Sequence, residues 1–224
     1  MQVNKSYYKN QGIHVITAIF TIEKGIPKVL LIKRKNEPFV GKWCLTGGAL
    51  RNDEDLIDGA KREIFEKSGI KDIDIYEFKT FGKLHRSPVM RMVAIGYIGV
   101  IDCNKVNILR ETNKTSNADW FRIDKIPSLA YDHEEILSCA IEFLKQKITE
   151  SNILSSLFPN NFTMPELQKA YEGILGKQFD RRNFRKKILE LNIVEDTNSV
   201  ARFEGKKPAK LYRFKQTSEN KSVF

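Results

Sequence analysis

The chain has little cysteine and no long hydrophobic segment. Its 224 residues include three cysteines, Cys44, Cys103 and Cys139, whose spacing fits neither a disulfide framework nor a metal site. An odd number of scattered thiols is typical of a reducing compartment. No run of about 18 apolar residues occurs, which argues against a membrane-spanning helix, and the first residues lack a secretory signal pattern. The sequence therefore predicts a soluble, cytoplasmic protein that does not bind a membrane.

Acidic residues are scarce relative to basic ones. The 38 Lys and Arg exceed the 28 Asp and Glu, which gives a net charge of +10 and favours an anionic partner. Residues 1–150 carry a net charge of +4, whereas the shorter segment 151–224 carries +6. An ordinary basic surface is an alternative explanation of the charge alone. With the motifs below, the change in composition predicts two domains, 1–150 and 151–224.

The most informative stretch, residues 48–70, reads GALRNDEDLIDGAKREIFEKSGI. It predicts a helix that begins near Asn52 or Asp53 and ends before Gly69, a residue suited to the left-handed conformation after a helix. Residues three and four apart share one face of a helix, so Glu63, Glu66 and position 67 should point toward one small volume. Clustered carboxylates are the ligands that Mg²⁺ prefers. A solvated charged face is the alternative.

The spacing of this stretch resembles the Nudix box, G-x5-E-x7-R-E-U-x-E-E-x-G-U, where U is a bulky aliphatic residue. All fixed positions match except that Lys67 replaces the second Glu of the E-E pair. The resemblance implies an α/β (α+β) Nudix sandwich with a mixed sheet flanked by helices. It also implies that Gly47, Glu63 and Glu66 hold Mg²⁺ or Mn²⁺ and that the two glutamates are catalytic. A lysine has no acceptor atom, so Lys67 predicts weakened metal binding and vestigial catalysis.

Two segments around the box predict a ligand site. Residues 34–48 resemble the family approach R-x-x-E-P-F-x-G-x-W-x-L-P-G-G, with Thr46 in place of Pro. Residues 81–91 resemble the run F-G-x-x-x-R-D-P-x-x-R found in Nudix-related regulators, with Ser87 in place of Asp. Guanidinium groups suit phosphate and ribose oxygens, although ordinary exposed arginines are an equal alternative. The predicted ligand-binding residues are Arg34, Glu37, Phe39, Arg86 and Arg91.

The remaining sequence of the first domain predicts five strands and one further helix. The expected strands are 14–22, 28–33, 73–81, 90–102 and 118–123, and a helix is expected over 134–148. Both His85 and His133 could suggest catalysis. We interpret His85 as a surface residue and His133 as a helix cap.

The last third of the chain has helix caps and amphipathic spacing that predict a separate group of helices. Thr163 and Glu166 predict a capping box at the start of one amphipathic helix, and Asp180 predicts the cap of a second. In the second helix Phe184 and Ile188 should face inward with Leu191. At 100° per residue the cationic side chains Arg182, Arg185 and Lys186 then lie on the opposite side. A strand from Ile193, a basic loop over 197–210 and a strand over 211–214 complete a predicted winged helix-turn-helix.

This segment, TMPELQKAYEGILGKQFDRRNFRKKILELNIVEDT with KPAKLYRF, resembles the C-terminal domain of Nudix-related transcriptional regulators of the NrtR and AraR type. The resemblance implies a homodimer that binds operator DNA and a metabolite effector, either ADP-ribose-like or a sugar, with no cofactor required for DNA binding. The alternatives are an active Nudix hydrolase of the ADP-ribose pyrophosphatase type and a merely solvated helix face. The expected DNA-binding residues are Arg181, Arg182, Asn183, Arg185, Lys186, Lys206, Lys207 and Lys210.

Overall fold

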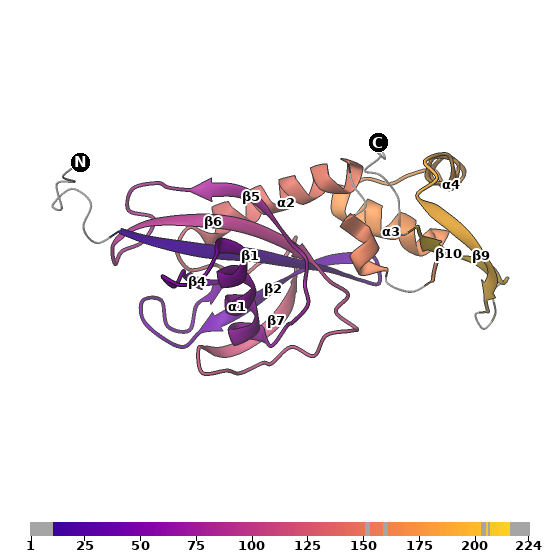
Figure 1. The fold of residues 1–224 in the computed structure, drawn as a ribbon. Helices are drawn as coiled ribbons and strands as arrows, with labels where there is room; N and C mark the ends of the chain where they lie inside the picture. The colour runs from indigo at the N-terminus through magenta and orange to yellow at the C-terminus, as the bar shows by residue number, and fades with distance from the viewer. Residues whose placement is uncertain (1–10, 151–152, 159–160, 203–204, 206, 216–224) are drawn as a thin grey trace. The chain divides into compact units, whose positions relative to one another are not determined.

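The computed structural model describes residues 11–150, 153–158, 161–202, 205 and 207–215 (Figure 1). The chain forms two compact units. One unit contains the chain up to Phe20, Val29–Gly99 and Val106–Ala140, and the other contains Thr21–Lys28, Val100–Lys105 and the chain from Ile141 onward. No helix among the described residues is long and apolar enough to cross a membrane.

A seven-stranded sheet organises the first part of the chain. Its strands are β1 (Gln11–Glu23), β2 (Ile26–Arg34), β3 (Trp43–Cys44), β4 (Thr46–Ala49), β5 (Ile75–Phe81), β6 (Arg91–Val100) and β7 (Thr115–Arg122). The strand order is β3-β2-β1-β6-β5, while β4 pairs with β1 and β7 pairs with β2. Helix α1 (Leu56–Ser68) and the first part of α2 (His133–Glu150), up to Ala140, flank this sheet (Figure 1). The expected Nudix sandwich is confirmed.

The central strands are apolar because both of their faces are covered. Every residue from Val15 to Thr21 in β1 is buried, as are Val29–Ile32 in β2 and the last residues of β6. Such continuous apolar runs distinguish a fully covered sheet from one with a solvated face. The strand β4 then places Gly47 opposite Ile16 of β1, which brings the start of the Nudix box onto the sheet.

Helix α1 begins later than expected. Its first residue is Leu56, after Asp55 in the cap position, so the predicted start near Asn52 or Asp53 was wrong. The reason is a turn held by Glu54, whose carboxylate accepts a 2.7 Å hydrogen bond from the Arg51 backbone N–H. The predicted end is confirmed, since Gly69 follows the helix with φ 76° and its N–H binds the Phe65 carbonyl.

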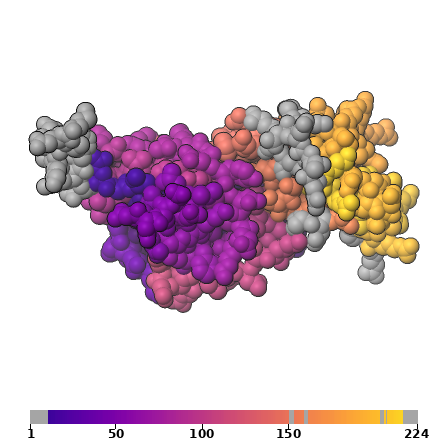
Figure 2. Space-filling model, viewed as in Figure 1, coloured from indigo at the N-terminus to yellow at the C-terminus, as the bar shows by residue number. Residues whose placement is uncertain are grey.

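The C-terminal segment forms the predicted winged helix-turn-helix. It contains η1 (Ile153–Leu157), β8 (Phe162–Thr163), α3 (Met164–Leu175), α4 (Arg181–Glu190), β9 (Val194–Ala201) and β10 (Ala209–Phe214), with strand order β8-β10-β9. The capping box of Thr163 and Glu166 is confirmed. Strand β9 continues to Ala201, so the first part of the expected loop over 197–210 is strand. Figure 2 shows α4, β9 and β10 as one continuous orange-to-yellow surface.

Candidate functional site: a cationic Nudix cavity and an exposed basic helix

Helix α1 brings the predicted carboxylates together, as the box spacing requires. Glu63 is buried, and its carboxylate lies where a Cβ atom on Gly48 would approach within 2.4 Å. Only glycine at position 48 therefore leaves room for this side chain. Glu66 lies one turn further along the same helix face, and its side chain is one-quarter exposed.

Arg62, Lys114 and Arg51 pair with one or both of these glutamates, in addition to Lys67. Arg62 lies 2.5 Å from Glu63 and 3.3 Å from Glu66, and it also holds Glu54 at 2.5 Å. Lys114, in the segment before β7, lies 3.3 Å from Glu63 and 2.5 Å from Glu66. Arg51 lies 3.1 Å from Glu66. The carboxylates thus have protein partners already.

Lys67 contacts the oxygens that the resemblance assigns to a metal. Its ammonium donates to the Gly47 carbonyl and lies 3.2 Å from Oε2 of Glu63. That Oε2 atom receives no well-directed hydrogen bond among the described residues, so the contact with Lys67 is an ion pair rather than a directed bond. Burial raises the pKa of Glu63, but Lys67, Arg62 and Lys114 outweigh burial and hold this pKa below its ordinary value.

The donor set does not fit a divalent cation in this arrangement. Among the described residues there is no group of three or more His, Cys, Asp or Glu side chains placed to hold a metal ion. Magnesium requires several oxygen ligands in near-octahedral geometry. Here the Gly47 carbonyl is bonded to Lys67, and Glu63 and Glu66 face ammonium and guanidinium groups.

A cavity of about 190 Å³ opens beside Lys67. It brings together three of the five predicted ligand-binding residues, Arg34, Glu37 and Arg86, and the predicted metal ligand Gly47. Its other lining residues are His14, Ile16, Pro38, Cys44, Leu45, Gly48, Lys67, Ser87, Met92, Tyr131 and His133. Three cations and one carboxylate line the cavity, so its charge suits an anionic ligand.

The two cavity arginines are fixed in place. Arg34 donates from Nε to the Pro38 carbonyl at 2.7 Å, and its guanidinium lies 5.1 Å from the ring centroid of Tyr131. Arg86 forms a bidentate ion pair with Asp132, and only 4% of its side chain is exposed. Arg86 is therefore not an ordinary exposed arginine. Held in this way, both guanidinium groups are preorganised for an anion.

The remaining predicted ligand residues do not line the cavity. Phe39 is 38% exposed and contacts the cavity residue Tyr131 edge-on, with ring centroids 4.7 Å apart. Arg91 donates to the backbone carbonyls of Gly82 at 2.8 Å and Lys83 at 3.2 Å. Phe39 thus packs against the cavity residue Tyr131 without lining the cavity itself. Arg91 instead stabilises the loop before β6 through its two hydrogen bonds.

Two histidines of the cavity were not predicted from sequence. His133 is buried, and its Nδ1 accepts a 3.1 Å hydrogen bond from the Leu45 N–H, so its interpretation as a helix cap was wrong. Burial, followed by the charge of Arg86, lowers the pKa of His133 to about 3 and that of His14 to about 4. Both are neutral at pH 7. His14 has no sequence signal, while His133 follows Asp132, the partner of Arg86.

Helix α4 presents an exposed basic face. Asp180 caps it by accepting from the Arg182 and Asn183 N–H groups, while Phe184 and Ile188 are buried beneath it. The exposed positions of α4 include the predicted residues Arg181, Arg182, Asn183, Arg185 and Lys186, together with Lys187, which sequence reasoning passed over. A helix with one buried stripe and an opposite basic face has the form of a recognition helix in a DNA major groove.

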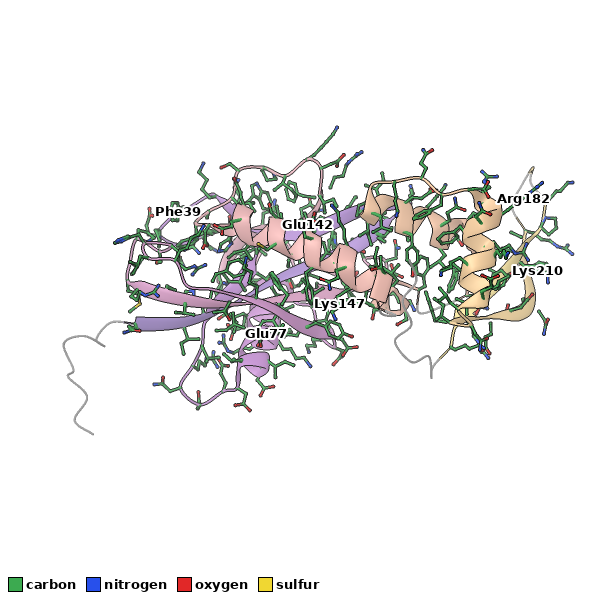
Figure 3. The ribbon with its side chains drawn as sticks, turned by 90° about the horizontal axis from the view of Figure 1, so that it is seen from above. Phe39, Glu77, Glu142, Lys147, Arg182 and Lys210 are labelled. Atoms are coloured by element: carbon green, nitrogen blue, oxygen red, sulfur yellow. The ribbon has the colours of Figure 1, made fainter. Side chains whose placement is uncertain are left out.

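Two further predicted DNA-binding residues, Lys207 and Lys210, belong to the wing. Figure 3 shows Arg182 on α4 and Lys210 on β10, and both are exposed. Lys210 forms a 2.8 Å ion pair with Asp196 of β9, and Arg185 donates to the Tyr212 hydroxyl at 3.1 Å, which ties α4 to the wing strands. Lys207 is exposed, and Lys206 lies outside the described residues.

Comparison with known proteins places both halves of the chain. The NUDIX domain model matches residues 12–139, and the NrtR DNA-binding winged helix domain model matches residues 154–214. These ranges lie on either side of the predicted boundary at residue 150. The ADPR responsive transcriptional repressor NtrR of Acinetobacter baylyi is 32% identical over 217 residues, which cover 95% of this chain and 86% of that protein.

Solved structures agree with this placement. NrtR of Shewanella oneidensis in complex with a 27mer DNA is 29% identical, with a TM-score of 0.75 over 91% of this chain and 93% of that chain. The Nudix domain of the same protein in complex with ADP ribose is 27% identical, with a TM-score of 0.57 over 64% of this chain and 94% of that chain. A Nudix domain is compatible with divalent metal use in general. The chain therefore belongs to the Nudix family and, within it, to the NrtR-type regulators that join a Nudix domain to a DNA-binding winged helix domain.

Proposed function

We propose that the protein is a transcriptional repressor that binds operator DNA through α4 and the wing and releases it when the Nudix domain binds ADP-ribose or a closely related NAD-derived anion. The observation that carries the proposal is the exposed basic face of α4, capped by Asp180 and backed by buried Phe184 and Ile188. The relatives crystallised with DNA and with ADP ribose support the two ligands. Operator binding implies action in the cytoplasm.

The cavity of the Nudix unit supports an anionic effector. Arg34, Lys67 and Arg86 line it, and Glu37 is the one carboxylate among its described lining residues. Guanidinium groups bind phosphate and ribose oxygens with two directed bonds. A neutral sugar such as arabinose would not use these charges, so the cavity favours the nucleotide-type effector over the sugar.

Residual hydrolysis is the second candidate function, because Glu63 and Glu66 retain their box positions on α1. We propose that Lys67 weakens binding of Mg²⁺ and Mn²⁺ enough to leave hydrolysis weak or absent. Turnover of ADP-ribose with either metal is the measurement. A rate within the usual enzymatic range, about 1 to 10³ per second, would favour the hydrolase instead.

The test of the repressor proposal uses duplexes selected by the protein from a random DNA pool. Fluorescence anisotropy then measures operator binding alone and with ADP-ribose, AMP or arabinose. We expect ADP-ribose to weaken operator binding and arabinose to have no effect. By linkage, operator DNA must weaken ADP-ribose binding by the same factor, which calorimetry measures directly. Equal ADP-ribose affinities with and without operator would show that the Nudix domain does not control DNA binding.

A further inference from the structure

The ammonium group of Lys67 contacts two of the three residues that the resemblance assigns to a metal ion. It donates to the Gly47 carbonyl and lies 3.2 Å from Glu63 Oε2. The side chain is only 12% exposed, so it is built into the site rather than extended into solvent. A lysine ammonium has three donors. The Gly47 carbonyl engages one of them, and the contact with Glu63 Oε2 is an ion pair without a directed hydrogen bond. Donor capacity therefore remains for a ligand in the cavity that Lys67 lines.

The charge of the neighbouring carboxylates is already balanced. Arg62 at 2.5 Å and Lys114 at 3.3 Å both face Oε1 of Glu63, while Lys67 faces Oε2. Glu66 lies 2.5 Å from Lys114 and 3.3 Å from Arg62. A divalent cation placed among these groups would meet several positive charges at ion-pair distance, and Coulomb repulsion opposes its binding.

The residues that line the cavity beside Lys67 carry more positive than negative charge, with Arg34, Lys67 and Arg86 against Glu37. Arg34 is held by the Pro38 carbonyl and Arg86 by Asp132, so both guanidinium groups are fixed before a ligand arrives. The low pKa values of His14 and His133, caused first by burial and then by these cations, agree with a positive potential. At about 190 Å³ the cavity is smaller than the roughly 300 to 1,000 Å³ of sites for whole drug-sized ligands. It therefore suits the charged part of a nucleotide.

We infer that Lys67 is a tethered replacement for the divalent cation, and that the Nudix domain binds a diphosphate anion directly through Lys67, Arg34 and Arg86 without any metal ion. This inference makes the proposed function more specific by assigning the residues that bind the diphosphate. It rests on the proposed function for the nucleoside part of the ligand. In a catalytic Nudix site, a divalent ion lies between the carboxylates and the diphosphate. In this protein the Lys67 side chain of α1 would take that place, between the Glu63 carboxylate and the diphosphate.

Calorimetry on the full chain tests this inference with two probes, ADP-ribose and inorganic pyrophosphate, each in EDTA and in excess Mg²⁺. We expect wild-type affinity in EDTA to lie within about threefold of that in Mg²⁺. Lys67→Met should lose at least about tenfold in affinity in EDTA, since it keeps the aliphatic stem but not the charge. Lys67→Arg should retain most of the affinity. Lys61→Met, at an exposed position of the same helix, is the matched control and should bind as wild type.

A metal titration supplies an independent measurement. Electron paramagnetic resonance of free Mn²⁺ should show no binding to the wild type at concentrations below about 1 mM, and measurable binding to Lys67→Glu. Tight Mn²⁺ binding by the wild type, a gain of tenfold or more in ligand affinity with Mg²⁺, or wild-type affinity in Lys67→Met would each overturn the inference. Failure of both probes to bind in EDTA would overturn it too.

The outcomes separate this inference from the proposed function. If ADP-ribose binds only with Mg²⁺ yet still releases operator DNA, the repressor proposal stands and the tethered cation is wrong. If pyrophosphate and ADP-ribose bind in EDTA without affecting operator affinity, the tethered cation stands and the repressor proposal fails. Thermal melts of all variants in EDTA establish that lost affinity does not come from lost folding.

Discussion

Arg86 and Asp132 form a bidentate ion pair, with Nε 2.8 Å from Oδ2 and Nη2 2.7 Å from Oδ1. The side chains are 4% and 16% exposed. Arg122 and Asp124 form a pair with the same two distances, but their side chains are 43% and 58% exposed. The two pairs thus differ mainly in burial, which is what decides the energetic consequence of breaking them.

We expect Asp132→Ala to lower the free energy of unfolding by about 3 kcal/mol, because it leaves the Arg86 guanidinium buried without its partner. Asp124→Ala, which breaks the exposed pair, should change stability by less than about 1 kcal/mol. Urea denaturation at pH 7 measures both. Equal losses in the two variants would contradict the role of burial, and Asp132→Ala should also weaken ADP-ribose binding by displacing Arg86.

Arg182 lies in the first turn of α4, where side chains of a recognition helix contact base edges. We expect Arg182→Ala to weaken operator binding by about 1 to 3 kcal/mol and to relax base preference at one position. Competition with single-base operator variants measures both effects. Lys61→Ala on α1 is the control. If the Arg182→Ala protein kept the wild-type base preference, Arg182 would contact a phosphate rather than recognise a base.

Lys207 lies in the wing, outside the exposed face of α4. We expect Lys207→Ala to weaken binding to all DNA sequences alike. The slope of log K for DNA binding against log salt should fall in magnitude by about 1, because one phosphate contact is lost. Titrations at several salt concentrations give the slope. An unchanged slope would show that Lys207 makes no contact with the backbone.

The stability of the protein should fall as the pH falls below 6.5. Burial, with the charge of Arg86, depresses the pKa of His133 to about 3, so the folded state stays neutral while the unfolded state binds a proton. This loss begins below the ordinary pKa of 6.5 and continues toward pH 3. His133→Asn keeps an acceptor for the Leu45 N–H but does not titrate. Between pH 7 and pH 5 the variant should therefore lose about 2 kcal/mol less than the wild type. Parallel pH profiles from urea unfolding would contradict the low pKa.

We expect a homodimer, because paired recognition helices match the two halves of a palindromic operator about 34 to 36 Å apart, or at a multiple of that spacing. Sedimentation at micromolar concentration measures the state of the free protein and of the complex with DNA. Arg182→Ala should remain dimeric while binding operator DNA more weakly, which separates assembly from binding. A monomer under both conditions would rule this expectation out.

Local sequence determined the elements that follow from spacing along one helix. Glu63 and Glu66 share a face of α1 because the helix repeats every 3.6 residues, and Gly69 ends that helix because it adopts φ 76°. The cap at Asp180 and the buried stripe of Phe184 and Ile188 follow from the same kind of rule. These interactions join residues within about one or two helical turns, so composition and spacing were sufficient to predict them.

Tertiary structure decided what surrounds those carboxylates. Lys114 reaches Glu63 across 51 residues of sequence, Arg86 reaches Asp132 across 46, and the Leu45 N–H reaches His133 across 88. No local period relates such positions, because sheet pairing and the course of the loops set their distances. The sequence by itself determined that a lysine replaces a box carboxylate and that a basic helix follows the Nudix domain. Only the fold decided that this lysine bonds to Gly47 and lines a cationic cavity, since that contact requires β4 and α1 to be packed together.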